Sequence, residues 1–219
     1  MFKNIIFDLD GTIAHTSPDI IASVNYSLNK KKINKKINLV IFKRIANNGS
    51  IKMFNRLLPK KNEVFIKDIN NIFLEHYKKN ICVKSKLKKN ILFFLDKCRK
   101  EKIKLFISTN KKEKFAKILI KKLNISKYFN FVCGVDTFRY KKPNPLHLAA
   151  LSNKFSLEKK EILYVGDTEI DSLMARNFKI YFVLFKNGYT TLGYNRISYD
   201  FLTSDYKQLY KDLKKIRLI

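Results

Sequence analysis

The sequence predicts an α/β fold in which helices flank a parallel sheet and an all-helical subdomain is inserted after the first strand. Two observations support this prediction. Short apolar runs recur along the chain with helical patterns between them, which is typical of a parallel sheet built from alternating strands and helices. The roughly 90 residues between the first two runs contain no comparable run, and their apolar residues follow a helical spacing.

Five strands are expected, because each of these runs is short, apolar and bounded by polar residues. The simplest organisation places the sheet domain in residues 1–15 and 83–219 and the helical insertion in residues 16–82. The expected strands are Asn4 to Phe7, Lys104 to Ser108, Phe131 to Cys133, Ile162 to Val165 and Ile180 to Leu184.

Helix signals agree with an insertion of this kind. Residues 16–19, Thr-Ser-Pro-Asp, supply a capping hydroxyl, an early proline and an acid near an expected helix start. Residues 47–50, Asn-Asn-Gly-Ser, predict a turn between two helices. The apolar positions with helical spacing are Ile20, Ile21, Val24, Leu28, Ile41, Ile45, Met53, Phe54, Leu57, Phe65, Ile69, Ile72, Phe73 and Tyr77.

Composition limits the class of protein. A chain of 219 residues with 46% apolar residues can form a sizeable core, and no window approaches the roughly 20 apolar residues of a membrane span. The first apolar stretch begins at Asn4 and leaves no room for a signal peptide, so we expect a cytoplasmic protein without membrane association. Three widely spaced cysteines indicate reduced thiols, and neither a disulfide framework nor a zinc site.

The net charge of +28 would normally indicate a nucleic acid or another anionic partner. The lysines, however, are scattered through almost every segment, without interleaved aromatic residues or a single basic stripe. Abundant Lys, Ile and Asn with few Gly and no Trp is the composition that an A/T-biased genome produces. We therefore expect no specific nucleic acid partner, and a basic nucleic-acid-binding or non-catalytic protein is the less favoured alternative. The charge should still attract small anions.

The first expected strand ends in the sequence DLDGT, residues 8–12. Residues two apart on a strand point the same way, so Asp8 and Asp10 would repel each other unless a cation or a proton offsets their charge. Mg²⁺, which prefers oxygen ligands, would do so. Gly11 would let the backbone turn sharply and approach a bound group. Taken alone, paired acids are equally consistent with a capped loop.

Three further polar segments are expected near strand ends, where parallel α/β sheets bind their ligands. Residues 108–110, Ser-Thr-Asn, offer hydroxyl and backbone N–H groups that suit a phosphoryl oxygen. In residues 141–145, Lys-Lys-Pro-Asn-Pro, prolines would fix the backbone beside an ammonium group. Residues 166–171, Gly-Asp-Thr-Glu-Ile-Asp, place two carboxylates at a strand end and a helix start. Each segment alone is a weak signal.

Together and in this order, the four segments resemble the motifs of the haloacid dehalogenase superfamily of phosphotransferases. The matching residues are DLDGT at 8–12, STN at 108–110, KKPNP at 141–145 and GDTEID at 166–171. The resemblance covers nearly the whole chain. It implies a Rossmann-like α/β core with a helical cap inserted after the first strand, a phosphatase that acts on a small phosphorylated metabolite, and Mg²⁺ as cofactor.

The resemblance also implies roles for individual residues. Asp8 would be the nucleophile that forms an aspartyl-phosphate, and Asp10 would be the general acid to the leaving alkoxide and then the general base for water. Mg²⁺ would be held by the Asp8 carboxylate, the Asp10 backbone carbonyl and Asp167. The implied phosphate-binding residues are Thr109, Asn110 and Lys142, and the implied supporting residues are Gly11 and Asp171.

Within the superfamily the likeness is greatest to phosphoglycolate phosphatases. This implies Mg²⁺-dependent hydrolysis of 2-phosphoglycolate to glycolate and phosphate, by a monomer or a homodimer. The cap would select the substrate through Gly49, Ser50 and Arg56. The likeness rests on residues 47–50 through Met53 and Arg56, on Thr109-Asn110-Lys111, on Leu123 to Phe129, on the KKPNP run and on Asn187-Gly188-Tyr189.

One position departs from the pattern of the superfamily. Relatives usually carry Asp three residues after the DGT sequence, where this chain has His15. A tolerated substitution is the favoured interpretation, and a titratable group near the hinge between core and cap is the alternative.

Other activities inside the superfamily stay open. The nearest alternative is a phosphatase for another small substrate, such as a sugar phosphate, a nucleotide or pyrophosphate. A phosphosugar mutase is less favoured, because Ile20 and Ile21 occupy the region where such relatives carry a cap-helix histidine. A haloacid dehalogenase is disfavoured, because it lacks the second acid, which here is Asp10.

Overall fold

The computed structural model describes residues 1–46 and 49–219, and the chain divides into two compact units. The first unit comprises residues 1–15 and 87–219, and the second comprises residues 16–86. The second unit therefore ends four residues later than the insertion expected at 16–82. Of the turn predicted at residues 47–50, Asn47 and Asn48 lie outside the described residues.

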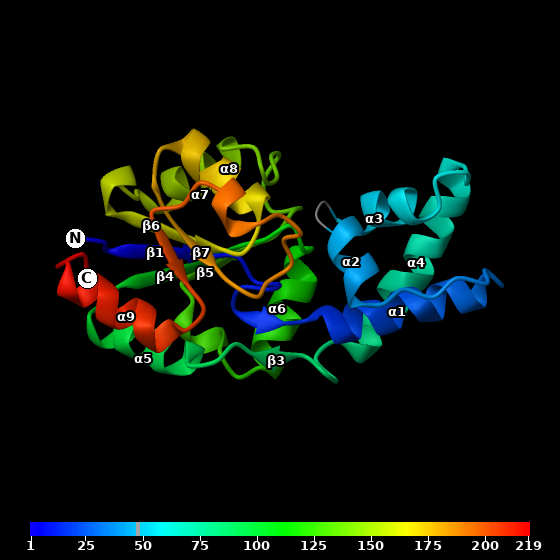
Figure 1. Cartoon of the computed structure of the whole chain (residues 1–219), viewed down its shortest axis with the longest axis horizontal. Helices are drawn as coiled ribbons and strands as arrows, with labels where there is room; N and C mark the ends of the chain where they lie inside the picture. Colours follow the sequence, from blue (N-terminus) through cyan, green and yellow to red (C-terminus); the bar gives the residue numbers. More distant parts are fainter. Residues whose placement is uncertain (47–48) are drawn as a thin grey trace. The chain divides into compact units, whose positions relative to one another are not determined.

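The first unit is built on a parallel sheet in the strand order β5-β4-β1-β6-β7-β8 (Figure 1). The predicted α/β class is confirmed, and all five predicted strands form to within one residue at either end. The short strand β8 and a separate two-stranded sheet of β2 and β3 were not predicted, because β2 and β3 have only two residues each and β8 ends in a polar threonine, unlike the fully apolar β5. The strands are β1 (Asn4–Phe7), β2 (Ala14–His15), β3 (Lys86–Leu87), β4 (Lys104–Ser108), β5 (Phe131–Cys133), β6 (Ile162–Gly166), β7 (Tyr181–Phe185) and β8 (Phe201–Thr203).

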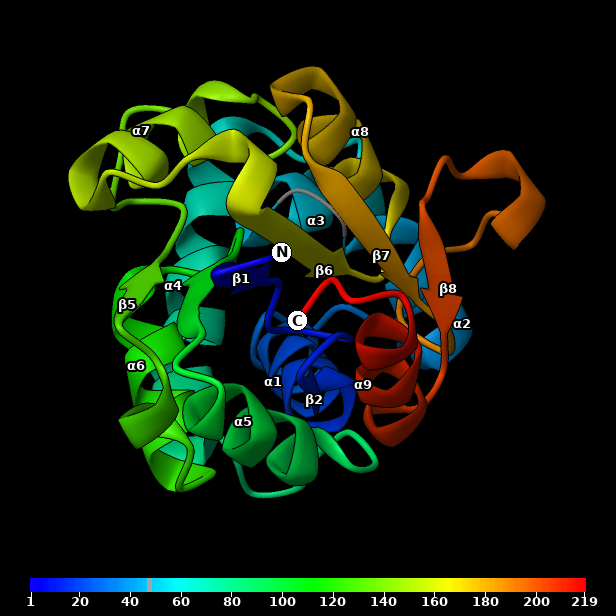
Figure 2. The same ribbon diagram turned by 90° about the vertical axis from the view of Figure 1, so that its left-hand side faces the viewer.

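Helices cover both faces of this sheet. Figures 1 and 2 show α7 and α8 over one face and α5, α6 and α9 over the other. The helices are α5 (Ile91–Lys100), α6 (Glu113–Lys122), α7 (Leu146–Phe155), α8 (Glu169–Phe178) and α9 (Tyr206–Lys215), with short 3-10 helices at Ser126–Tyr128, Lys159–Glu161 and Tyr194–Arg196. A sheet covered on both faces explains why its strands are continuously apolar and do not alternate with polar residues.

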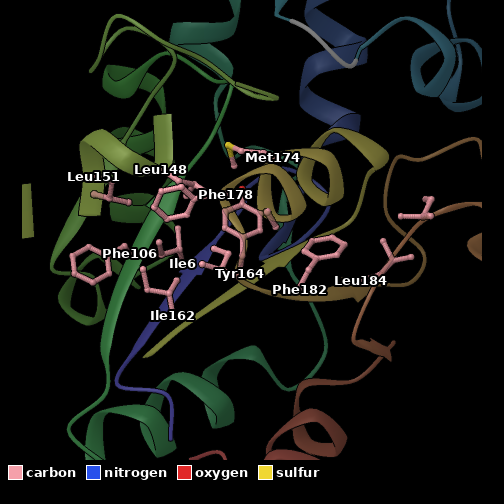
Figure 3. Packing of buried hydrophobic residues seen from close by; sticks show 13 residues of the cluster. Ile6, Phe106, Leu148, Leu151, Ile162, Tyr164, Met174, Phe178, Phe182 and Leu184 are labelled. Carbon is pink, nitrogen blue, oxygen red and sulfur yellow. The ribbon is translucent and has the colours of Figure 1, made fainter. Parts of the chain in front are cut away.

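A row of large side chains crosses the sheet under α7 and α8. Ile6 is paired with Phe106 on one side and Tyr164 on the other, and Tyr164 is paired with Phe182. All four are buried and pack against apolar residues of both helices (Figure 3). Burial of one such side chain contributes about 1.5–3 kcal/mol to the stability of the folded state. Because side chains alternate along a strand, Asp8, two residues after Ile6, leaves the sheet on this same face.

The second unit is a bundle of four helices among its described residues: α1 (Ser17–Lys30), α2 (Leu39–Ile45), α3 (Ser50–Leu57) and α4 (Glu63–Asn80). Phe54 meets Phe73 edge to face, and Phe73 stacks on Tyr77, with ring centroids 5.8 and 5.7 Å apart. Thr16 precedes α1 but does not make the predicted side-chain cap. In the part of the chain that the structure describes, no helix is long and apolar enough to cross a membrane.

Candidate active site

The register of the sheet brings three of the predicted motif segments to one edge. Phe7 at the end of β1 is paired with Ile107 of β4 and with Val165 of β6. The segments that follow these three residues therefore leave the sheet side by side, at the carboxyl ends of the strands. The Asp8 backbone N–H donates to the Val165 carbonyl at 2.8 Å, which continues this alignment one residue beyond β1.

Three carboxylates meet at this edge. Asp8, Asp167 and Asp171 each offer an oxygen, these oxygens lie within 4.8 Å of one another, and all three residues are buried. Burial raises the pKa of Asp167 well above its usual range, and the charges of Asp8 and Asp171 add to the rise. Burial likewise raises the pKa of Asp8 to about 6, although the Lys142 ammonium opposes the rise. The fold thus holds Asp8 and Asp167 where their negative charges are costly.

The Lys142 ammonium lies among these carboxylates. Its Nζ atom is 2.8 Å from Asp8 Oδ1, 2.7 Å from Asp171 Oδ1 and 3.1 Å from the Tyr164 hydroxyl. Only 3% of the Lys142 side chain is exposed. Burial alone would lower the pKa of Lys142, but the carboxylates of Asp171 and Asp8 outweigh it and hold the pKa well above its usual value. Lys142 is therefore a fixed positive charge beside Asp8.

Tyr164 was not among the predicted site residues. Its hydroxyl lies 3.1 Å from Asp171 Oδ1 and 3.3 Å from the Ser108 carbonyl oxygen, in addition to its contact with Lys142. From the sequence it is one more aromatic residue of an apolar strand. The only available signal is its position two residues before Gly166, which places its ring on the sheet face from which Asp8 projects.

Asp171 joins Lys142 to the start of α8. Its Oδ2 accepts hydrogen bonds from the Thr168 backbone N–H and hydroxyl at 3.2 and 2.7 Å, so it caps the helix while its Oδ1 contacts Lys142 and Tyr164. Both carboxylate oxygens of Asp171 are therefore engaged by the protein, and the supporting role expected for Asp171 stays a prediction.

Asp167 is enclosed by backbone and a hydroxyl. Its two oxygens accept hydrogen bonds from Thr12 Oγ1 and from the Tyr189 backbone N–H, each at 2.6 Å. A Cβ atom at Gly11, whose φ is +90°, or at Gly188 would overlap the Asp167 carboxylate. Glycine is required at both positions, because the backbone passes directly against this acid.

Asp10 has a lysine partner that was also not predicted as a site residue. Lys111 Nζ lies 2.9 Å from both Asp10 Oδ1 and Asp10 Oδ2. The side chains of Lys111 and Asp10 are 7% and 19% exposed. Lys111 follows directly after the predicted phosphate-binding pair Thr109-Asn110, but in a chain with this many lysines its position alone was a weak signal.

The remaining predicted core residues hold neighbouring segments in place. The Thr109 backbone N–H donates to the Cys133 carbonyl at 2.9 Å, and Asn110 Nδ2 donates to the Lys142 carbonyl at 3.3 Å. Asn110 thus ties the end of β4 to the loop that carries Lys142. The His15 ring, in β2, lies 6.3 Å from the ring of Tyr189.

The predicted substrate-selecting residues belong to the second unit. Gly49, with φ of +86°, comes directly before α3, which begins at Ser50. Arg56, also in α3, donates from Nη1 to the Ile45 carbonyl at 3.3 Å. Their role in substrate selection stays a prediction.

The residues at the strand ends fit a divalent cation. Asp8, Asp167 and Asp171 would bring three negative charges, and Lys142 brings one positive charge. Two negative charges would therefore remain, and one divalent cation would neutralise them. The donors to Asp167 in the described part of the chain are a hydroxyl and an amide, neither of which carries a charge. Carboxylate oxygens are also the ligands that Mg²⁺ prefers.

Comparison with known proteins gives the family to which this chain belongs. A family model described as haloacid dehalogenase-like hydrolase matches residues 5–185, a range that contains all four motif segments. The chain therefore belongs to the haloacid dehalogenase-like hydrolase family, and the resemblance noted in its motifs is confirmed.

Individual relatives make the comparison more specific. The chain is 32% identical over 190 residues to a phosphoglycolate phosphatase of Mesorhizobium japonicum, with 85% of this chain and 83% of the relative covered. It is 27% identical over 208 residues to a phosphoglycolate phosphatase of Agrobacterium fabrum, with 93% and 89% covered. A crystal structure described as a predicted phosphoglycolate phosphatase from Haemophilus somnus superposes with a TM-score of 0.87 at 27% identity, covering 96% and 97% of the two chains. The prediction that the chain is a phosphatase of this superfamily is confirmed.

Proposed function

We propose that the protein is a Mg²⁺-dependent phosphatase that hydrolyses 2-phosphoglycolate to glycolate and phosphate through an aspartyl-phosphate. The observation that carries this proposal is the buried Lys142 ammonium held between Asp8 and Asp171, with Asp167 beside them. Such a centre suits a reaction in which a doubly negative phosphoryl group must approach a carboxylate nucleophile. The phosphoglycolate phosphatases among the relatives support the choice of substrate.

The first half of the reaction uses both acids of the DLDGT segment. An Asp8 oxygen attacks phosphorus, and the bond between phosphorus and the ester oxygen breaks as the Asp8–phosphorus bond forms. The leaving alkoxide of glycolate takes a proton from the Asp10 carboxyl.

The second half regenerates the enzyme. Asp10, now a carboxylate, takes a proton from water as the water oxygen attacks phosphorus. The bond between phosphorus and Asp8 breaks, phosphate leaves, and Asp8 returns to its starting form.

Positive and polar groups of the core would hold the phosphoryl oxygens throughout. Lys142 supplies a charge that burial fixes in place, and Thr109 and Asn110 lie on the segment after β4 that reaches the same strand ends. Preorganised donors of this kind stabilise transition-state charge without reorganising during the reaction.

Mg²⁺, when bound, would neutralise phosphoryl charge and orient the group for in-line attack. Asp8, the backbone carbonyl of Asp10 and Asp167 would hold it. Asp171 would act through Lys142, to which it is already bonded.

We further propose that residues 16–86 act as a cap that excludes water and selects the substrate. Within this unit, Gly49, Ser50 and Arg56 would take part in selection, with Arg56 offering a guanidinium to a carboxylate. A sugar phosphate, a nucleotide or pyrophosphate is the alternative substrate.

A substrate panel tests this proposal. Phosphate release from 2-phosphoglycolate, common sugar phosphates, nucleotides and pyrophosphate is measured with purified protein, in Mg²⁺ and after chelation. We expect the highest kcat/KM for 2-phosphoglycolate and loss of activity on chelation that added Mg²⁺ restores. A tenfold or greater preference for another substrate would overturn the assignment of phosphoglycolate, and full activity in chelator would overturn the dependence on a metal.

A further inference from the structure

The Lys111–Asp10 pair is held by backbone contacts on both sides of Lys111. The Lys111 N–H donates to Thr109 Oγ1 at 3.3 Å, and its carbonyl accepts from the Val135 N–H at 3.0 Å. The segment after β5 is itself fixed, because Thr137 Oγ1 accepts from the Gly134 N–H at 2.7 Å. The backbone around Lys111 is thus constrained, and its ammonium contacts the Asp10 carboxylate.

The place of this ammonium relative to the reaction follows from the role of Asp10. As the proton donor to the leaving group, Asp10 must contact the ester oxygen that leaves with glycolate. Lys111 contacts both oxygens of Asp10 and therefore lies on the leaving-group side of the reaction centre. Lys142, by contrast, contacts Asp8 and lies on the phosphoryl side.

The leaving group of 2-phosphoglycolate carries a charge close to the ester oxygen. A single methylene separates that oxygen from the carboxylate carbon, so a cation beside Asp10 is within reach of the carboxylate. A lysine ammonium has three donors on a flexible stem, which suits contact with two carboxylates at once.

We propose that Lys111 binds the carboxylate of the substrate and so makes the core, not only the cap, selective for phosphate esters of 2-hydroxy acids. This inference rests on the proposed phosphatase function. An ester of a neutral alcohol of the same size offers the phosphoryl group to Lys142 but nothing to Lys111. A charge-assisted hydrogen bond to a carboxylate accounts for a preference of about 10- to 100-fold.

Two competing roles for the positive charge at this position predict different behaviour. If Lys111 only orients Asp10, its loss slows every ester alike, because every ester needs a proton at its leaving oxygen. If the general positive charge of the protein attracts the extra carboxylate, any nearby lysine contributes equally. Lys112, the exposed residue next to Lys111, is a matched control for the second role.

The experiment compares kcat/KM for 2-phosphoglycolate and ethyl phosphate, in which a methyl group replaces the carboxylate, at constant ionic strength. In Lys111→Met we expect a fall of about 10- to 100-fold for 2-phosphoglycolate and less than about threefold for ethyl phosphate. Lys112→Met should retain the wild-type ratio. Lys111→Gln, which keeps a polar head group, repeats the test if the methionine variant folds poorly by its melting temperature.

A binding measurement separates substrate recognition from proton transfer. In an Asp8→Asn background, which lacks the nucleophile, adding Lys111→Met should weaken calorimetric binding of 2-phosphoglycolate about tenfold or more and leave ethyl phosphate unchanged.

The outcomes distinguish this inference from the function on which it rests. Equal losses on both esters, or an unchanged ratio in Lys111→Met, would overturn the role of Lys111 while the phosphatase assignment stands. A shift of the ratio in Arg56→Met alone would assign carboxylate recognition to the helical unit instead. A wild-type enzyme with no preference for 2-phosphoglycolate over ethyl phosphate would overturn both the proposed substrate and this inference.

Discussion

Two lysine–aspartate pairs occupy the carboxyl edge of the sheet, and they differ in depth. Lys142 and its partner Asp8 have side chains that are 3% and 11% exposed, whereas Lys111 and Asp10 are 7% and 19% exposed. Lys142 also contacts Asp171 and Tyr164, two further buried groups. In the proposed reaction, the deeper pair would serve the phosphoryl group, which every substrate shares, and the shallower pair would serve the leaving group, in which substrates differ.

We expect this difference in depth to make the group at Asp8 harder to alter than the group at Asp10. A buried charge network is costly to alter, because removing one member leaves the others unpaired in a poorly solvated site. Lys111 and Asp10 have fewer charged neighbours among the described contacts, so a change there should leave fewer groups unpaired. The following experiments test this contrast and the segments around the two pairs, in order of decreasing effect.

Loss of the deeper ammonium should have the largest effect. We expect Lys142→Met to reduce kcat by about a thousandfold, because the phosphoryl group loses a preorganised charge. Phosphate release is the measurement, with the melting temperature recorded in parallel. Lys141→Met, at the exposed neighbouring position, should behave as wild type. Substantial turnover by Lys142→Met would contradict a special role for the deeper pair.

A buried histidine next to the loop that carries Lys142 should make the stability of the protein depend on pH. Buried His147 contacts Cys133 Sγ at 3.1 Å through Nε2 and the Tyr140 carbonyl at 2.7 Å through Nδ1. Burial lowers the pKa of His147 to about 4. Between about pH 6.5 and pH 4 the unfolded chain binds a proton that the folded chain does not, so the stability should fall with the pH by up to about 3 kcal/mol.

Urea unfolding at pH 7 and pH 4.5 measures this effect, with His147→Gln for comparison. The variant should lose less stability than wild type on acidification, because glutamine does not titrate. An equal loss in both proteins would show that His147 does not titrate with the predicted sign.

Tyr164→Phe should have a smaller effect, confined to the deeper pair. Removing the hydroxyl takes away one partner of the Lys142 ammonium and leaves the packing of the ring intact, so we expect kcat to fall by about tenfold. In a Lys142→Met background the same change should have little further effect, since Tyr164 acts through Lys142. Full additivity in this double-mutant cycle would indicate a structural role for the hydroxyl instead.

His15→Asp should have the smallest effect. His15 contacts the ring of Tyr189 and belongs to neither lysine pair in the described structure. We expect kcat/KM within about twofold of wild type. The pH–rate profiles of the two proteins should superimpose, and a displaced profile would assign His15 a titratable role in the reaction.

The sheet could be predicted from the sequence because its signals are local. The apolar runs of β1, β4, β5, β6 and β7 and the acids that follow β1 and β6 are visible in short windows, and parallel topology places the ends of such strands together. The strand β8 is not a fully apolar run, because it ends in Thr203, and its place at the edge of the sheet depends on pairing with β7.

The partners of the site residues could not be predicted in the same way. Lys111 and Asp10 are far apart in the sequence, and only the strand register and loop conformation bring them together. Asp19 lies in the first turn of α1, as expected, but its hydrogen bonds from the Lys84 and Ser85 backbone at 2.8 and 2.9 Å could not be predicted. In a chain so rich in lysine, composition does not indicate which ammonium is buried.

Detection of a phosphoryl group on Asp8 separates a covalent mechanism from direct attack by water. Wild-type enzyme is mixed with excess 2-phosphoglycolate and Mg²⁺, quenched in acid within a turnover, and its peptides are mapped by mass spectrometry. We predict that the peptide containing Asp8 gains the mass of one phosphoryl group, and that Asp8→Asn shows neither this gain nor phosphate release. Steady phosphate release by wild type without phosphorylation of Asp8, together with wild-type turnover by folded Asp8→Asn, would contradict a nucleophilic role for Asp8.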